Sequence, residues 1–352
     1  MVQTKRTIPL KRKLLFSALV VLFVFLGLEC LLRLTGFNVN QSVERMEFTF
    51  PIDDYNKSSP QPFLQRDDVL FWKPRADVLG HNSMGVYGPE FSPEKKPGVF
   101  RIVCLGDSCT HYGPISYPDM LRAFLDKLAP GQFEVINAGV IGYTSHQGLL
   151  MLEHKVLAWK PDLVTVYFGW NDHWLARGLE DKQQAAPEVS GVASAVGSIR
   201  LVQVAGLLTS GTQNQEVPKM RVEQADYRNN LRRMIELGRE HSFETWMLTA
   251  PHAMDRGVPP YLVSSGEIRS ASALIPLHQR YTSIVREVAR EAKVSLVDFE
   301  AQMDSMDKSK LFIEDHIHLS EEGRLYVAQV LLQRLKESGT LKGVEPTAAP
   351  AP

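Results

Sequence analysis

The chain has 352 residues, of which 44% are hydrophobic and 22% are charged. This composition, together with only three cysteines, excludes a disordered chain, a collagen-like fibre, a multi-span membrane protein and a disulfide scaffold. The formal net charge is −1, but residues 1–34 hold six basic residues and one acid, so the remainder carries 33 basic against 39 acidic residues, a net charge of −6. A body of that sign lacks the basic surface that neutralises phosphates, and we expect no nucleic-acid partner.

The N-terminus has the features of a membrane anchor. Residues 14–28 contain no charge, and the apolar run continues to Leu32 with Glu29 as its single acid. A helix of this length crosses a hydrocarbon core of about 30 Å. Five basic residues and no acid precede the run, which predicts a cytoplasmic N-terminus. We therefore predict a basic cytoplasmic tail at residues 1–13 and a transmembrane signal anchor at residues 14–34.

This anchor predicts a single-pass protein of the inner (cytoplasmic) membrane, with its folded domain on the periplasmic or extracellular side. The alternative is a cleaved signal peptide. However, no Ala-x-Ala-like cleavage site follows Leu28, and Leu-Glu precedes Cys30, where a lipoprotein signal requires small residues. Glu29 and Arg33 lie one helical turn apart, and we expect them to pair at the outer interface of the membrane.

Strand-like and helix-like segments alternate through the rest of the chain. Residues 35–98 are rich in Pro, Asp, Asn and Ser and predict a stalk and cap with one short strand near residues 69–72. Five later runs have the length and residue content of buried strands, at residues 101–105, 133–137, 162–168, 245–249 and 294–298. Helix-like stretches fall at residues 118–128, 147–159, 225–240, 276–292 and 320–338. This alternation predicts one α/β domain at residues 99–340, with a parallel sheet covered on both faces.

Residues 176–224 interrupt the alternation. The segment is too long for an ordinary connection, and it has polar ends and a weakly apolar middle. It is typical of a lid, a partner-binding insertion or a mobile loop, and we favour a lid that selects the substrate. Residues 341–352 predict a disordered tail.

Four polar motifs follow the predicted strands or precede the last helix. The first strand ends in Gly-Asp-Ser108, and open α/β sheets bind ligands beyond the carboxyl ends of their strands. Glycines after the second strand, among them Gly142, let a backbone N–H turn toward a ligand. The third strand is followed by Asn171, whose amide can donate to a developing oxyanion. Asp315 and His318 are three residues apart, so the carboxylate can hold one ring nitrogen while the other faces the serine.

Together these motifs resemble those of the SGNH (GDSL-like) hydrolases. The matching pattern is Gly106-Asp107-Ser108, Gly142, Gly169-x-Asn171-Asp172 and Asp315-x-x-His318. The resemblance spans about residues 100–338, and residues 71–74 with residues 82–83 look like the bacterial, membrane-anchored members. It implies a three-layer α/β/α, flavodoxin-like fold with a five-stranded parallel sheet, and an enzyme that hydrolyses or transfers acyl esters. Cys109 stands where the family pattern has Leu, at a position without a chemical role.

The resemblance also assigns roles to residues. Ser108 would be the nucleophile and His318 the general base, oriented by Asp315. The oxyanion hole would consist of the backbone N–H groups of Ser108 and Gly142 and the side-chain amide of Asn171. The expected substrate is an ester with an acetyl or other short acyl group on a glycan or lipid of the cell envelope. No cofactor and no metal are implied, and an envelope protein partner stays open.

Two other functions remain as alternatives, an O-acyltransferase acting on an envelope glycan and a non-catalytic domain that binds a glycan or a partner. The absence of a Gly-x-Ser-x-Gly elbow disfavours an α/β-hydrolase site. A metallophosphoesterase would require a second Asp three residues after Asp107, where Thr110 stands. We expect Asp107 and Asp172 to brace loops through backbone N–H groups rather than to act chemically.

Overall fold

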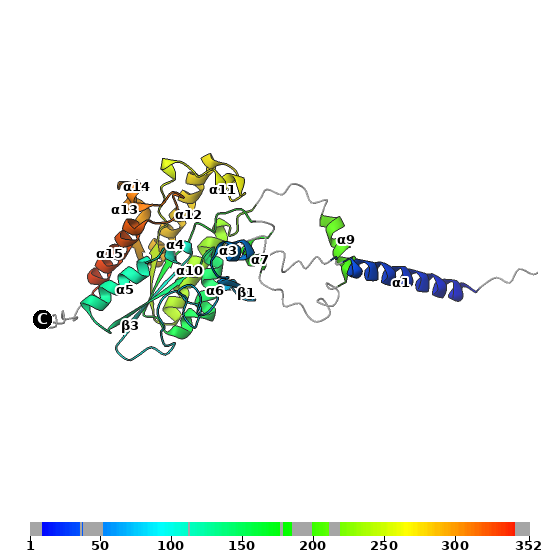
Figure 1. Cartoon of the computed structure of the whole chain (residues 1–352), viewed down its shortest axis with the longest axis horizontal. Helices are drawn as coiled ribbons and strands as arrows, with labels where there is room; N and C mark the ends of the chain where they lie inside the picture. The colour runs from blue at the N-terminus through cyan, green and yellow to red at the C-terminus, as the bar shows by residue number, and fades with distance from the viewer. Residues whose placement is uncertain are drawn as a thin grey trace, which may run out of the picture. The chain divides into compact units, whose positions relative to one another are not determined.

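The computed structural model describes residues 9–35, 37, 52–111, 113–176, 179–184, 199–210 and 219–341 (Figure 1). The chain divides into two units, one of residues 1–44 and 186–217 and the other of residues 45–185 and 218–352. Residues 1–8 of the predicted cytoplasmic tail and residues 342–352 of the predicted disordered tail lie outside the described residues.

The larger unit contains the predicted five-stranded parallel sheet. Its strands are β3 (Phe100–Gly106), β4 (Phe133–Gly139), β5 (Leu163–Tyr167), β6 (Glu244–Leu248) and β7 (Ser295–Val297). The order across the sheet is β4-β3-β5-β6-β7, and each neighbouring pair is parallel. The first strand of this sheet in chain order, β3, therefore lies between the second, β4, and the third, β5, which is the flavodoxin-like order. The predicted fold class is confirmed, and each strand overlaps the run predicted for it.

Helices connect the strands and close the domain. They are α4 (Ser108–His111), α5 (Tyr117–Leu128), α6 (Ser145–His154), α7 (Asp181–Gln184), α10 (Gln224–Glu240), α11 (Tyr261–Ser264), α12 (Ala271–Ala292), α13 (Phe299–Asp304), α14 (Lys308–Leu311) and α15 (Glu321–Glu337), with 3-10 turns at Val156–Trp159 and Met254–Arg256. The helix predicted from Pro276 begins at Ala271, because α12 continues through the proline at the cost of one helical hydrogen bond. The helix predicted at residues 147–159 ends earlier, at His154, and continues as a 3-10 turn.

Each face of the sheet has its own hydrophobic core. Val103 and Leu105 of β3 pack with α6, α10 and α12, whereas Ile102 and Cys104 pack with α5, α13 and α15. These four side chains are fully buried, which explains why the strand is apolar without alternation. Helices α5 and α15 lie side by side although they are far apart in the sequence (Figure 1).

A cap segment precedes the sheet in the larger unit. It consists of α3 (Ile52–Ser58) and an antiparallel hairpin of β1 (Leu64–Asp67) and β2 (Phe71–Pro74). The sequence predicted one strand here, because the polar and charged β1 lacks the apolar content of a buried strand. Trp72 of β2 is fully buried, and its Nε1–H donates to the carbonyl oxygen of Ile141 at 3.0 Å. The cap segment thus contacts the loop that follows β4.

The smaller unit contains the apolar N-terminal helix α1 (Leu10–Leu34) and helix α9 (Arg200–Ser210). Within the described residues, α1 is the one helix long and apolar enough to cross a membrane, with a mean hydropathy of 2.6 over its most apolar 18 residues. Arg33 Nε donates to Glu29 Oε1 at 2.8 Å, as the one-turn spacing predicted. The Glu29 carboxylate also accepts the backbone N–H groups of Arg200 and Leu201 at 3.1 and 3.0 Å. Glu29 therefore caps the N-terminus of α9.

Candidate active site

The first candidate residue lies just beyond the carboxyl end of β3. Ser108 is the first residue of α4 and is partly exposed. Gly106 permits the tight passage from strand to helix, because a Cβ at this position would lie 2.1 Å from Thr110 Oγ1. The buried carboxylate of Asp107 accepts the N–H of Cys109 at 2.8 Å and closes the turn. The local sequence therefore holds the Ser108 hydroxyl at the edge where ligands bind in open α/β sheets.

The structure brings Ser108 together with His318 and Asp315. His318 Nε2 lies 2.8 Å from Ser108 Oγ, and His318 Nδ1 lies 2.6 Å from Asp315 Oδ2. Asp315 Oδ1 accepts the backbone N–H groups of Ile317 and His318, both at 2.9 Å. Burial alone would raise the pKa of Asp315, but the hydrogen bond and charge of His318 and these backbone donors hold that pKa below its usual value. Because the ionised Asp315 carboxylate accepts the Nδ1–H of His318, the ring carries its proton on Nδ1. His318 Nε2 then carries no proton and can accept the one from Ser108.

The candidate oxyanion donors differ in what they contact. Gly142 lies in the loop after β4 with φ at +79°, a backbone conformation that favours glycine. In the described part of the chain, neither the N–H of Ser108 nor that of Gly142 donates a hydrogen bond, so both are available to an oxyanion. The Asn171 amide donates to the Tyr143 carbonyl oxygen at 3.0 Å and to Asp107 Oδ2 at 3.3 Å. To contact an oxyanion, the Asn171 amide would have to share with it the N–H that donates to Asp107 Oδ2.

Two further carboxylates near the site contact backbone groups. Asp107 accepts the N–H of Cys109, and Asp172 Oδ1 accepts the N–H of Ser145, the first residue of α6, at 2.9 Å. Burial raises the pKa of Asp107 to about 6 and that of Asp172 to about 7. Among the residues that the structure describes, Asp172 Oδ2 has no hydrogen-bond partner. These contacts agree with the bracing role expected from the sequence.

The other histidines near the motifs have different surroundings. The Nδ1–H of His316 donates to the carbonyl oxygen of Gly257 at 2.5 Å. His173 and His111 lie among aromatic rings, and burial lowers the pKa of each to about 3. Both rings are therefore neutral packing groups, and His318 is the ring that meets the serine.

Three residues outside the chemical motifs hold the loop after β4. The indole N–H of Trp72 donates to Ile141, and the Tyr143 hydroxyl donates to the Trp72 carbonyl oxygen at 2.6 Å. Arg221 Nη1 donates to the Gly142 carbonyl oxygen at 2.8 Å. The sequence offered a signal only for Trp72, which belongs to the stretch that looks like membrane-anchored SGNH hydrolases.

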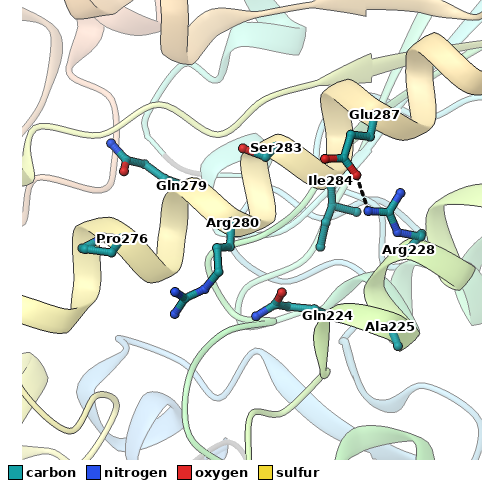
Figure 2. Close-up of a pocket in the computed structure, with 9 residues that line it drawn as sticks. All are labelled: Gln224, Ala225, Arg228, Pro276, Gln279, Arg280, Ser283, Ile284 and Glu287. Carbon is teal, nitrogen blue, oxygen red and sulfur yellow. Dashed lines mark hydrogen bonds and ion pairs between the residues drawn. The ribbon is translucent and has the colours of Figure 1, made fainter.

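A groove of about 470 Å³ lies elsewhere, between α10 and α12 (Figure 2). Arg228 and Glu287 form an ion pair on its wall, drawn as a dashed line in Figure 2. None of the predicted site residues lines this groove, so it is separate from the Ser108 site. Within the described ranges, no three His, Cys, Asp or Glu side chains come together as ligands for a metal ion.

Comparison with known proteins gives matches at the levels of family, sequence and structure. The model of the GDSL-like lipase/acylhydrolase family matches residues 104–324. The uncharacterized lipoprotein YqeF of Bacillus subtilis (strain 168) is 24% identical over 211 residues, which are 57% of this chain and 71% of that protein. The family match contains all five predicted site residues, which are Ser108, Gly142, Asn171, Asp315 and His318.

Two solved structures illustrate the structural matches. A lipase/acylhydrolase from Enterococcus faecalis is 19% identical, with 71% of this chain and 100% of that chain covered and a TM-score of 0.47. The acetylxylan esterase Axe2 from Geobacillus stearothermophilus is 16% identical, with 73% and 100% covered and a TM-score of 0.44. The family match extends over more than half of the chain, from β3 into α15. The chain therefore belongs to the GDSL-like lipase/acylhydrolase family and is an ester-hydrolysing enzyme.

Proposed function

We propose that this enzyme cleaves esters through a Ser-His-Asp triad of Ser108, His318 and Asp315. The observation that carries the proposal is the continuous contact from Ser108 Oγ to His318 Nε2 at 2.8 Å and from His318 Nδ1 to Asp315 Oδ2 at 2.6 Å. A serine hydroxyl is a weak nucleophile unless a base is adjacent. Here the base and the group that orients it are both within hydrogen-bond distance.

The proposed reaction has two steps. Ser108 Oγ attacks the ester carbonyl carbon while His318 accepts the hydroxyl proton, and the ionised Asp315 stabilises the imidazolium that forms. The N–H groups of Ser108 and Gly142 hold the oxyanion of the tetrahedral intermediate. His318 then gives its proton to the departing alcohol and leaves an acyl-serine. Water, deprotonated by His318, attacks the acyl carbon, and His318 returns that proton to Ser108 Oγ as the acid leaves.

The proposed substrate carries an acetyl or another short acyl group on a glycan or lipid of the cell envelope. This substrate is the one that the resemblance to the SGNH hydrolases implies, and the substrate panel described below tests it directly.

The envelope location rests on the N-terminal helix. Helix α1 has 25 residues and is about 37 Å long at 1.5 Å per residue, enough to cross a bilayer. The acid in its sequence, Glu29, is paired with Arg33, and a relative in Bacillus subtilis is named a lipoprotein. We propose a cytoplasmic tail at residues 1–13, a membrane anchor at residues 14–34, a stalk and cap at residues 35–98 and a catalytic domain outside the inner membrane at residues 99–340.

Ester hydrolysis by variants of the full-length protein in detergent tests the chemistry. Ser108→Ala and His318→Ala should each lower kcat by at least about 10³-fold, and the double variant should be little worse because the residues act together. His316→Ala is the matched control, since its ring donates to Gly257 instead, and it should keep activity within a few-fold. Activity that survives Ser108→Ala contradicts the proposal.

A substrate panel tests the acyl group and the fate of the acyl-enzyme. The wild type should prefer p-nitrophenyl acetate and butyrate to the octanoate, and it should release free acetate from acetylated glycans. If the acyl group instead appears on an added glycan with little free acetate, the O-acyltransferase alternative replaces hydrolysis, because water must then be excluded from the acyl-serine.

A further inference from the structure

The backbone around Gly142 is held on both sides by side chains from distant parts of the chain. The peptide unit that carries the Gly142 N–H begins with the Ile141 carbonyl, which accepts the Trp72 indole N–H at 3.0 Å. The next peptide unit begins with the Gly142 carbonyl, which accepts Arg221 Nη1 at 2.8 Å. Because peptide units are planar, holding both carbonyl groups fixes the two backbone dihedral angles of Gly142. A glycine at φ +79° would otherwise have the widest choice of conformations.

Arg221 is itself held by a buried ion pair. Its Nη2 and Nε donate to the two carboxylate oxygens of Asp181 at 3.0 and 3.2 Å. Arg221 is 3% exposed, and Asp181 is 0% exposed. The Thr144 hydroxyl also donates to Asp181 Oδ2 at 2.7 Å, and Gln147 Oε1 accepts Arg221 Nη2 at 3.1 Å. The Arg221 guanidinium therefore contacts both Gly142 in the loop and Gln147 in the first turn of α6. The Asp181 carboxylate contacts Thr144, which lies between them in the sequence.

The two side chains that hold the peptide units on either side of Gly142, Trp72 and Arg221, also contact each other. The Arg221 guanidinium lies over the Trp72 ring, 5.8 Å from its centroid. Planar stacking on an aromatic ring and a bidentate contact with a carboxylate are properties of arginine that lysine does not share. Since a buried, unpaired charge is costly, Asp181 is the partner that makes Arg221 possible here.

We propose that Arg221, held by Asp181 and stacked on Trp72, is a positioning residue that aims the Gly142 N–H at the oxyanion of the ester reaction. This inference rests on the proposed function, because the Gly142 N–H has an oxyanion to stabilise only if Ser108 forms a tetrahedral intermediate with the ester. Arg221 acts through the backbone and touches no substrate. It supplies geometry rather than charge, since four of its five N–H donors are occupied by Asp181, Gln147 and the Gly142 carbonyl oxygen.

The position of the ion pair also relates the site to the insertion. Asp181 precedes residues 186–217 and Arg221 follows them. The two ends are joined by backbone bonds, from Asp181 N–H to the Arg221 carbonyl oxygen at 2.8 Å and from Arg221 N–H to the Trp174 carbonyl oxygen at 2.8 Å. The residues at the base of the insertion are thus the ones that hold the loop of Gly142.

Two conservative variants of the full-length protein test the proposal. Arg221→Lys keeps the positive charge beside Asp181 but cannot make the bidentate and stacked contacts together, and Trp72→Phe keeps a buried ring but removes the N–H that holds Ile141. Each should lower kcat on p-nitrophenyl acetate by about 10- to 100-fold with KM within about twofold, as misplacement of an oxyanion donor does. Arg228→Lys is the matched control and should leave kcat unchanged. It makes the same substitution in an ion pair away from the Gly142 loop, between Arg228 of α10 and Glu287 of α12.

A second readout separates positioning from a general structural role. Affinity for a trifluoromethyl ketone, which forms a tetrahedral adduct on the serine, should fall in both variants by the same factor as kcat/KM. Affinity for the product acid should stay unchanged, and so should the far-UV circular dichroism spectrum. Equal loss of ketone and product affinity would overturn the inference.

The activity of Ser108→Ala, measured in parallel, separates a failure of the proposed function from a failure of the role proposed for Arg221. Hydrolysis that persists in Ser108→Ala overturns the proposed function and this inference with it. Hydrolysis that requires Ser108 but stays within about twofold of wild type in both Arg221→Lys and Trp72→Phe overturns this inference alone.

Discussion

Replacing Asp315 by Asn tests the triad with the smallest change in shape. In the structure, both carboxylate oxygens of Asp315 accept hydrogen bonds. Oδ2 accepts from His318 Nδ1 at 2.6 Å, and Oδ1 accepts from the backbone N–H groups of Ile317 and His318 at 2.9 Å. An asparagine amide has one oxygen, so it can serve only one of these two sets of donors.

Either orientation of the amide harms the site, but in different ways. If the oxygen stays with the two backbone N–H groups, the NH₂ group faces Nδ1 of His318, and the ring must carry its proton on Nε2. A protonated Nε2 cannot accept the proton of Ser108. The opposite orientation places the NH₂ group against two backbone donors, each of which then loses its partner at about 1–3 kcal/mol. The first orientation is therefore favoured, and kcat should fall about 10⁴-fold, or about 5 kcal/mol in the activation barrier.

Steady-state hydrolysis of p-nitrophenyl acetate at pH 7–9 measures this loss. Glu314→Gln is the matched control, because it changes the neighbouring, exposed carboxylate in the same way and should leave kcat within a few-fold. If Asp315→Asn keeps kcat within tenfold of wild type, the tautomer of His318 does not limit the reaction, and Asp315 does not have the orienting role proposed for it.

Three further predictions concern stability, the insertion and location. Because the pKa of Asp172 is raised to about 7, its contribution to stability is fully present below pH about 3.8 and is lost as pH rises through about 7. Asp172→Asn should therefore gain stability relative to wild type as pH rises from 5 to 8.5, by about 3 kcal/mol in chemical denaturation, at about 1.4 kcal/mol for each pH unit up to pH 7; a pH-independent difference would contradict the raised pKa. Replacing residues 186–217 by a short Gly-Ser linker should preserve folding and p-nitrophenyl acetate hydrolysis, because the chain on either side is already joined by backbone hydrogen bonds. A lid predicts that the same variant changes its activity on bulky substrates, and an unfolded product would contradict the prediction. The full-length protein should sediment with membranes and a variant lacking residues 1–36 should not, whereas a wild-type form that begins near residue 37 would indicate a cleaved signal peptide.

The sequence was sufficient to predict the sheet and the residues at its edge. A strand such as β3 is buried on both faces, so it appears as a continuous apolar run whose end is easy to place. Parallel strands end at one edge, so Ser108, the loop of Gly142 and Asn171 come from segments that meet there. The contact between Ser108 and His318 followed from the resemblance and from the three-residue spacing of Asp315 and His318, rather than from periodicity.

The residues that hold this site in place were harder to predict. Asp181 and Arg221 lie in the polar ends of the segment predicted as one insertion at residues 176–224, and polar residues in such a segment are usually exposed. In the structure, these ends are buried against the loop after β4, since each charge is paired with the other. The segment assigned to the smaller unit is accordingly narrower, at residues 186–217. Pairing between residues 40 positions apart leaves no local pattern in a single sequence.

Covalent trapping of the nucleophile shows whether Ser108 attacks the ester. The full-length protein is incubated with a fluorophosphonate ester, digested and mapped by mass spectrometry, with Ser108→Ala and His318→Ala beside the wild type. We expect one adduct, on Ser108, formed at least about 10³-fold more slowly in His318→Ala and absent from Ser108→Ala. An adduct on another residue, or continued ester hydrolysis by protein in which Ser108 is fully modified, would contradict the claim that Ser108 attacks the ester.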